Sequence, residues 1–121
     1  MENLHEGDLI LSVSASGKQV ILKWQGESRS KDPAGFLDPY LSNLVHSLDD
    51  NDLVVDFREL ESMNSSTVLP IINLIKKLEE KTINTEILYN ENSSWQKASF
   101  IPLSAITKIY KHIKVVPRKG D

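Results

Sequence analysis

The clearest pattern in the chain is an uninterrupted apolar run followed by a helical apolar stripe. Leu53–Phe57 favours β-structure at nearly every position, which is typical of a central strand covered on both faces. Residues 58–63 are expected to turn the chain. After them, apolar residues at helical spacing predict a helix that packs one face on the sheet, with Leu69 outside that face. The stripe consists of Val68, Ile71, Ile72, Ile75 and Leu78.

The N-terminal part of the chain predicts a β-hairpin. Leu9–Ser14 has the period of two of a half-buried strand, and Val20–Trp24 has it again. Between them, residues 15–17 form a turn in which Gly17 is free to adopt positive φ. Residues 26–31 form a polar connection that is suited to a binding surface.

Two Asp-Pro pairs compete for the start of the first helix. Asp32–Pro33 and Asp38–Pro39 each offer a capping residue followed by a proline at the first helical position. Because an interior proline costs roughly 3 kcal/mol, the pattern favours a short turn and then a main helix from Pro39 to Leu48. A helix joined to two strands by short links predicts that the strands are parallel.

The C-terminal part predicts a strand, a helix and an ambiguous end. Glu86–Tyr89 is the strand, and Asn92 or Ser93 caps the helix, whose length Pro102 limits. The apolar residues beyond Pro102 fit a continued helix, whereas Ile113–Val116 also fits a final strand. Periodicity leaves both open.

Composition narrows the class of protein. The chain has 121 residues, of which 40% are hydrophobic, and this suits one core rather than two. We therefore expect a single α/β domain over residues 1–121, with a mixed sheet, a core over about residues 9–116 and short polar ends. The chain has no cysteine, which excludes disulfides and thiolate chemistry. With a net charge of -3, no signal peptide and no apolar run of ~20 residues, we expect a cytoplasmic protein that neither binds nucleic acid nor inserts into a membrane.

The most distinctive candidate chemistry lies just before the helix that follows the central strand. Asn64, Ser65, Ser66 and Thr67 are all residues that favour a helix N-terminus. Such an end carries roughly half a positive charge and unpaired N–H groups, so it tolerates a phosphate on Ser65 or Ser66. The plainer interpretation is that the four residues only cap the helix.

Other chemistries have less support. The chain has no G-x-S-x-G motif, and His5, His46 and His112 lack a sequence context that marks a catalytic base. The histidines are also too scattered for a metal site, and no glycine-rich loop is present for a nucleotide, so no metal or cofactor is expected. Asp56, at the end of the central strand, is expected to bond to the residues that follow it.

The C-terminal segment is basic, whereas the rest of the chain is acidic. Its basic residues are Lys108, Lys111, His112, Lys114, Arg118 and Lys119. A segment of this kind suits an acidic partner or a solvated surface.

The order of the elements and three local strings together resemble the STAS-domain family, best known from bacterial anti-sigma-factor antagonists. Gly26–Glu27 resembles the start of the family's Gly-Glu-Leu-Asp. Leu53–Phe57 followed by Met63–Val68 resembles its strand and its Met-Asp-Ser-Ser-Gly-Leu switch. Ala105–Tyr110 resembles Gly-Leu-Asp-Lys-Ile-Phe near the family's end. The resemblance covers roughly residues 9–116.

This resemblance implies a regulatory domain that does not itself catalyse a reaction. In the family, the unmodified antagonist binds an ATP-dependent serine kinase that doubles as an anti-sigma factor. Phosphorylation of a serine then releases it, and transcription is regulated by this partner switching. The matching serine here is Ser65, with Ser66 as the alternative. The implied partner-binding residues are Gly26, Glu27, Asn64, Ser65, Ser66 and Thr67.

Two further functions stay open at this point. One is a STAS-like structural subunit that is never phosphorylated and belongs to a larger complex, such as a lipid transporter. The other is a small hydrolase or transferase that uses Ser65 or Ser66. Asn64 and Thr67 stand where the family has Asp and Gly, and Pro70 is expected to disturb the start of the helix.

Overall fold

The computed structural model describes residues 1–120, over which six strands form one mixed sheet. The strands lie side by side in chain order, antiparallel from the first to the third and parallel from the third to the sixth. They are β1 (Leu4–Glu6), β2 (Leu9–Ser16), β3 (Gln19–Ser28), β4 (Asp52–Met63), β5 (Thr85–Asn90) and β6 (Ile113–Arg118). The expected α/β class, mixed sheet and N-terminal hairpin are confirmed.

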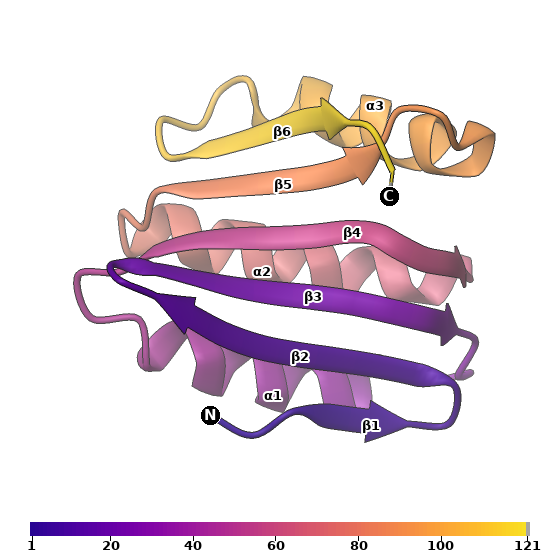
Figure 1. Cartoon of the computed structure of the whole chain (residues 1–121), viewed down its shortest axis with the longest axis horizontal. Helices are drawn as coiled ribbons and strands as arrows, with labels where there is room; N and C mark the ends of the chain where they lie inside the picture. Colours follow the sequence, from indigo (N-terminus) through magenta and orange to yellow (C-terminus); the bar gives the residue numbers. More distant parts are fainter. Residues whose placement is uncertain (121) are drawn as a thin grey trace.

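Each pair of neighbouring parallel strands is joined through a helix. The helices are α1 (Ala34–His46), α2 (Val68–Glu80) and α3 (Ser94–Thr107), and a 3₁₀ turn, η1 (Ser65–Thr67), leads into α2. Right-handed crossovers that all advance in one direction place their helices on the same face. Figure 1 shows α1 behind β2, α2 behind β4 and α3 behind β6, all on the same side of the sheet. Over residues 1–120, none of the helices is long and apolar enough to cross a membrane.

The strand β4 is the centre of the sheet, as predicted, but the expected cover on both faces is wrong, because all three helices lie on one face (Figure 1). Leu53, Val55 and Phe57 are at most 1% exposed, and the strand lies between β3 and β5. The expected turn at residues 58–63 is wrong, because β4 continues to Met63. The first of two irregularities in its pairing with β3 falls between Asp56 and Glu59, so Leu60 is buried beyond Phe57, and the ladder runs on to the end of β3. This extra length carries β4 to the turn that precedes α2.

The predicted start of the first helix is also wrong. The helix α1 follows Pro33, the first of the two possible starts, and contains Pro39. Leu37 and Leu41, on either side of Pro39, are 0% and 2% exposed. Burying the two leucines contributes about 3–6 kcal/mol together, which offsets the roughly 3 kcal/mol that an interior proline costs. Packing therefore decides where α1 begins.

Pro102 does not limit α3, contrary to expectation. The helix continues to Thr107, and Leu103 and Thr107 beyond the proline are buried. Pro102 has no N–H to donate to the Ala98 carbonyl, so one hydrogen bond of the helix is missing. Both residues are exposed, so water can bond to that carbonyl instead. The predicted cap is confirmed, since the Ser93 hydroxyl accepts a hydrogen bond from the Gln96 amide at 3.4 Å. The ambiguous C-terminal segment is a strand, β6.

The helix α2 differs from expectation at its start and in its buried face. Pro70 does not disturb the start, because the first N–H groups of a helix have no intrahelical partner to lose. Val68 is 38% exposed and Ile72 is half-buried, so neither is a core position of the stripe. The buried residues of α2 are Pro70, Ile71, Leu74, Ile75 and Leu78. Leu69 is 59% exposed, in agreement with the prediction.

Truncating Ile75 to alanine should lower the free energy of unfolding by about 2–5 kcal/mol, because the side chain is only 2% exposed. The matched change Leu69→Ala should cost no more than about 0.5 kcal/mol, since that side chain faces solvent. Urea melts of both variants measure the difference. Equal losses at the two positions would contradict the observed orientation of α2.

Candidate functional site

The serine turn, residues 64–67, lies where β4 ends and α2 begins. Ser65 and Ser66 are exposed, whereas Thr67 is fully buried. Within residues 1–120, neither the Ser65 nor the Ser66 hydroxyl donates or accepts a hydrogen bond. The two serines thus present unoccupied hydroxyl groups to solvent.

Hydrogen bonds from the neighbouring side chains fix the serine turn in place. The Thr67 hydroxyl donates to Asn64 Oδ1 at 2.8 Å. The Ser28 hydroxyl must therefore be the donor in its 2.7 Å contact with Thr67 Oγ1. Asn64 Nδ2 donates to the Ser30 carbonyl at 2.7 Å, and the Asn64 amide donates to the Ser28 carbonyl at 2.9 Å. These bonds join the serine turn to the end of β3.

The interpretation that these four residues only cap the helix is not supported. Neither η1 nor α2 has a side-chain capping bond at its N-terminus. The N-cap residue of α2 is Thr67, and its hydroxyl bonds to Asn64 and Ser28 instead. No local pattern pairs Ser28 with Thr67, because 39 positions separate them.

Gly26 and Glu27 lie on the β3 segment that approaches the serine turn. In the sheet, Gly26 is opposite Leu60 and Glu27 is opposite Ser62, just before the turn. Gly26 has a φ of 83°, and a Cβ there would lie 1.9 Å from the Asp8 carbonyl oxygen, so the position requires glycine. The Glu27 amide donates to that same carbonyl. The structure therefore brings all six predicted site residues to the same end of the neighbouring strands β3 and β4.

A hollow of about 310 Å³ lies beside this end of the strands, between the β1–β2 turn and the end of β3. Its lining residues are Glu6, Gly7, Asp8, Leu9, Glu27, Ser28, Arg29, Ser30 and Phe36. Three carboxylates face one guanidinium here, and Arg29 is already paired with Glu27 at 3.3 Å. The hollow is suited to a polar or cationic group of a partner.

Apolar side chains adjoin the exposed serines. Val68 and Leu69, in the first turn of α2, are 38% and 59% exposed. Exposed aliphatic side chains next to polar groups are a usual feature of protein–protein contact surfaces. The site therefore combines two free hydroxyls, a fixed backbone and an apolar flank.

The histidines do not serve the serine turn. His46 Nδ1 lies 3.2 Å from the Ser42 carbonyl, and His112 Nδ1 lies 3.1 Å from Glu79 Oε2. In the described part of the chain, residues 1–120, no cluster of three or more His, Cys, Asp or Glu side chains is arranged to hold a metal ion. Within the described residues 1–120, no side chain that could act as a base is hydrogen-bonded to the Ser65 hydroxyl.

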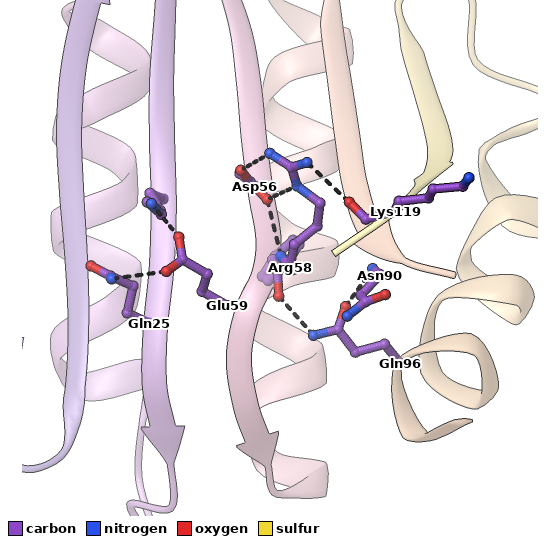
Figure 2. A network of polar contacts seen from close by, with 9 residues as sticks. Gln25, Asp56, Arg58, Glu59, Asn90, Gln96 and Lys119 are labelled. Carbon is purple, nitrogen blue, oxygen red and sulfur yellow. Dashed lines mark hydrogen bonds and ion pairs between the residues drawn. The ribbon is translucent and has the colours of Figure 1, made fainter. Parts of the chain in front are cut away.

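Asp56 has a structural role on the open face of the sheet. Its carboxylate accepts hydrogen bonds from the Arg58 amide, Nε and Nη2 at 2.9–3.0 Å (Figure 2). Arg58 Nη1 also donates to the Lys119 carbonyl. Burial by itself raises the pKa of Asp56, but the hydrogen bonds and charge of Arg58, with the charge of Lys23, lower it below the usual value. Asp56 bonds to a following residue as expected, but it neither ends the strand nor precedes a turn, because β4 continues to Met63.

The fold is that of anti-sigma factor antagonists. An anti-sigma factor antagonist from Mycobacterium paratuberculosis matches with a TM-score of 0.64 and 17% identity, over 92% of this chain and 90% of that chain. The antagonist SpoIIAA in its unphosphorylated form matches with a TM-score of 0.55 and 14% identity, over 82% of this chain and 96% of that chain. A protein with a SpoIIAA-like fold from Shewanella loihica matches with a TM-score of 0.57 and 14% identity, over 96% of this chain and 89% of that chain. No protein-family model and no curated protein sequence matches the chain.

Proposed function

We propose that this chain is a non-enzymatic regulatory domain that binds a protein partner at the surface around the serine turn and is switched by phosphorylation of Ser65. The observation that carries the proposal is the exposed, unbonded Ser65 hydroxyl on a turn fixed by other side chains. The fold, shared with anti-sigma factor antagonists, supports a protein partner. The partner we propose is an ATP-dependent serine kinase that also acts as an anti-sigma factor, which would place the chain in the cytoplasm.

A phosphate on Ser65 is compatible with the folded state. The bonds that fix the turn come from Asn64, Thr67 and Ser28, so modification of Ser65 leaves them intact. The phosphate would add about -1.5 to -2 charges, and the positive end of the α2 dipole would offset part of that charge. The effect of phosphorylation therefore falls on the interface, where the partner would have to desolvate the phosphate.

The contact surface we propose includes both sides of the turn. On one side are Val68 and Leu69, whose apolar surface would be buried by the partner. On the other side are Gly26 and Glu27 with the adjoining hollow, which would receive a polar or cationic side chain. Ser65 is exposed and precedes Val68 and Leu69 in the chain, so charge added to it would fall within the proposed contact surface.

Changing Ser65 to aspartate should weaken the complex with the partner by roughly tenfold or more, about 1.4 kcal/mol, because the carboxylate would be desolvated in the interface. Ser65→Ala should bind as the wild type does, and neither variant should melt differently. The partner is first co-purified with the tagged wild-type chain. Isothermal titration with the purified partner then measures the affinity, and phosphopeptide mapping after incubation with the partner and ATP shows which serine is modified.

The matched control is Ser94→Asp, since Ser94 is an exposed serine in the first turn of another helix, α3. It should leave the affinity unchanged. An undiminished Ser65→Asp complex, together with an unmodified Ser65 after incubation with the kinase and ATP, would refute the switch. The retained complex would then identify the chain as a structural subunit that is never phosphorylated.

A further inference from the structure

The charges of this chain are divided between two parts of the fold. Residues 92–120 contain six Lys or Arg residues and no Asp or Glu, whereas residues 1–91 contain eight Lys or Arg against sixteen Asp or Glu. The basic part comprises α3, β6 and the segments around them. This separation is far larger than the net charge of -3 suggests.

The basic part also forms one end of the molecule. The strand β6 is the last in the sheet, and α3 packs mainly against β6 and β5. Figure 1 shows this basic end at the top of the view, with β1 at the opposite edge of the sheet. The basic end can therefore meet a flat surface without hindrance from α1 or from the N-terminal hairpin.

The outward side of α3 is apolar, which is unusual for a helix that faces solvent. Ala98, Ile101, Pro102, Ala105 and Ile106 are exposed, with Lys97 as the exposed charge within the helix. Ile101 and Ile106 are 55% and 48% exposed, and Ile109, just past the helix, is 81% exposed. By contrast, the outward side of α2 carries Lys76 and Glu80. Nothing in the described chain, residues 1–120, covers these isoleucines.

Exposed lysines follow this apolar surface along the chain. Lys108, Lys111 and Lys114 are exposed in the segment from the end of α3 to β6. Lys108 and Lys114 also line a hollow of about 370 Å³, whose other lining residues are Ser104, Thr107, Tyr110, Ile113, Val115 and Val116. The Thr107 hydroxyl already donates to the Ser104 carbonyl, so the two lysines are the groups at this hollow that suit a phosphate.

We propose that the basic end, α3 with Lys108–Lys114 and β6, docks on the surface of a membrane that contains anionic lipids. The exposed isoleucines enter the boundary between headgroups and acyl chains, and the lysines neutralise the lipid phosphates. This contact is peripheral, because no helix within residues 1–120 is able to span a bilayer. It is independent of the serine turn and of the partner proposed there.

The shape and charge of this end favour a lipid surface over another protein. The apolar side chains stand on the convex side of a helix, so a protein partner would need a matching groove, whereas a fluid headgroup layer conforms to them. A symmetric contact with a second copy would place one set of six cations against another. The edge of β6 is further protected from strand pairing by Pro117 and by exposed Lys114 and Arg118.

Vesicle flotation with the full chain tests the proposal. The chain should float with phosphatidylcholine vesicles that contain phosphatidylglycerol, and bind pure phosphatidylcholine vesicles at least roughly tenfold less well. Binding to the anionic vesicles should fall steeply as salt is added. Combining Lys108→Gln, Lys111→Gln and Lys114→Gln should weaken it by about a hundredfold, since each basic residue near an anionic surface contributes about fivefold. Combining Ile101→Ser and Ile109→Ser should weaken it by roughly tenfold.

The controls alter the same residue types on another helix. Lys76→Gln with Lys77→Gln, and separately Leu69→Ser, should leave flotation within about twofold of the wild type. All the altered side chains are exposed or partly exposed, so the melting curves should not move and lost binding cannot be ascribed to unfolding. Absence of binding to anionic vesicles at low salt would overturn the proposal, as would full binding by the lysine variant. Retention on immobilised polyglutamate without flotation would assign this end to an acidic protein instead. Self-association that the isoleucine changes abolish, in the absence of flotation, would assign it to a second copy.

Discussion

Replacing Gln96 with leucine is expected to lower the free energy of unfolding by about 3–5 kcal/mol, although the two side chains are similar in size. Gln96 is 1% exposed, and its Nε2 donates to the carbonyls of Phe57 and Leu60 at 2.8 and 2.9 Å. Its Oε1 accepts from the Asn90 amide at 2.7 Å (Figure 2). Leucine would leave three backbone groups without partners, and each such buried group costs about 1–3 kcal/mol.

This effect is expected because β4 and β5 separate at this point. Their pairing ends at Asp56 and Leu88, and the Gln96 side chain bridges the gap beyond. Urea melts followed by circular dichroism measure the loss. The control is Gln25→Leu on the open face, where the amide makes one 3.5 Å contact with Glu59, and it should change stability by less than about 0.5 kcal/mol. A Gln96 variant as stable as the control would mean that the bridge contributes nothing.

Replacing Arg58 with methionine is expected to cost about 3 kcal/mol near pH ~7, because it leaves the Asp56 carboxylate buried without its main partner. Asp56 is 6% exposed and pairs with Arg58 at 2.9 Å. Lys23 still interacts with the carboxylate, which keeps the expected loss at the lower end of the usual range for a broken buried pair. The control is Arg29→Met, since Arg29 has a side chain 71% exposed and should contribute less than about 1 kcal/mol through Glu27.

The pH dependence of the two proteins should differ at this residue. In the wild type the pKa of Asp56 is lowered, so its contribution is complete above the unfolded pKa of about 3.9 and is lost as the pH falls through the folded value. Without the Arg58 guanidinium, burial of Asp56 is opposed only by the amide of residue 58 and the charge of Lys23, so its pKa should lie above the wild-type value and protonation at lower pH should relieve the unpaired charge. The stability deficit of Arg58→Met should therefore shrink between pH ~7 and pH ~4, as measured by urea melts at both values. A deficit that is constant or grows toward acid would contradict the assigned role of Arg58.

In the candidate site, the local sequence motif predicted the exposed serine but not the hydrogen bonds around it. The string at residues 63–68 pointed to Ser65, and the structure places Ser65 in an exposed turn at the start of α2. The bonds that fix that turn were not predictable. Ser28 and Thr67 are 39 positions apart, so their hydrogen bond depends on how β3 and the serine turn meet in the folded chain. The sequence therefore predicted the two candidate serines, whereas it did not predict the hydrogen bonds that hold their turn.

The sequence by itself determined the elements whose signal lies in near neighbours. The apolar run at residues 53–57 predicted the central strand, and Leu53, Val55 and Phe57 are buried in the core. The expected cover on both faces is wrong, since the helices lie on one face of the sheet only (Figure 1). The period of two predicted the hairpin, and helical spacing predicted α2. The existence of each element follows from the periodic burial of its own side chains.

Only the tertiary structure decided where several elements begin and end. Pro39 and Pro102 lie inside helices because buried leucines beside them offset the cost of proline, and burial depends on the rest of the fold. The three residues of β1 form a strand because β2 offers an edge to pair with, and β4 extends to Met63 because β3 pairs with it that far. The apolar outward side of α3 likewise became visible only when packing had fixed which of its residues are buried. Periodicity is a property of neighbouring residues, whereas these boundaries and surfaces depend on contacts between residues far apart in the chain.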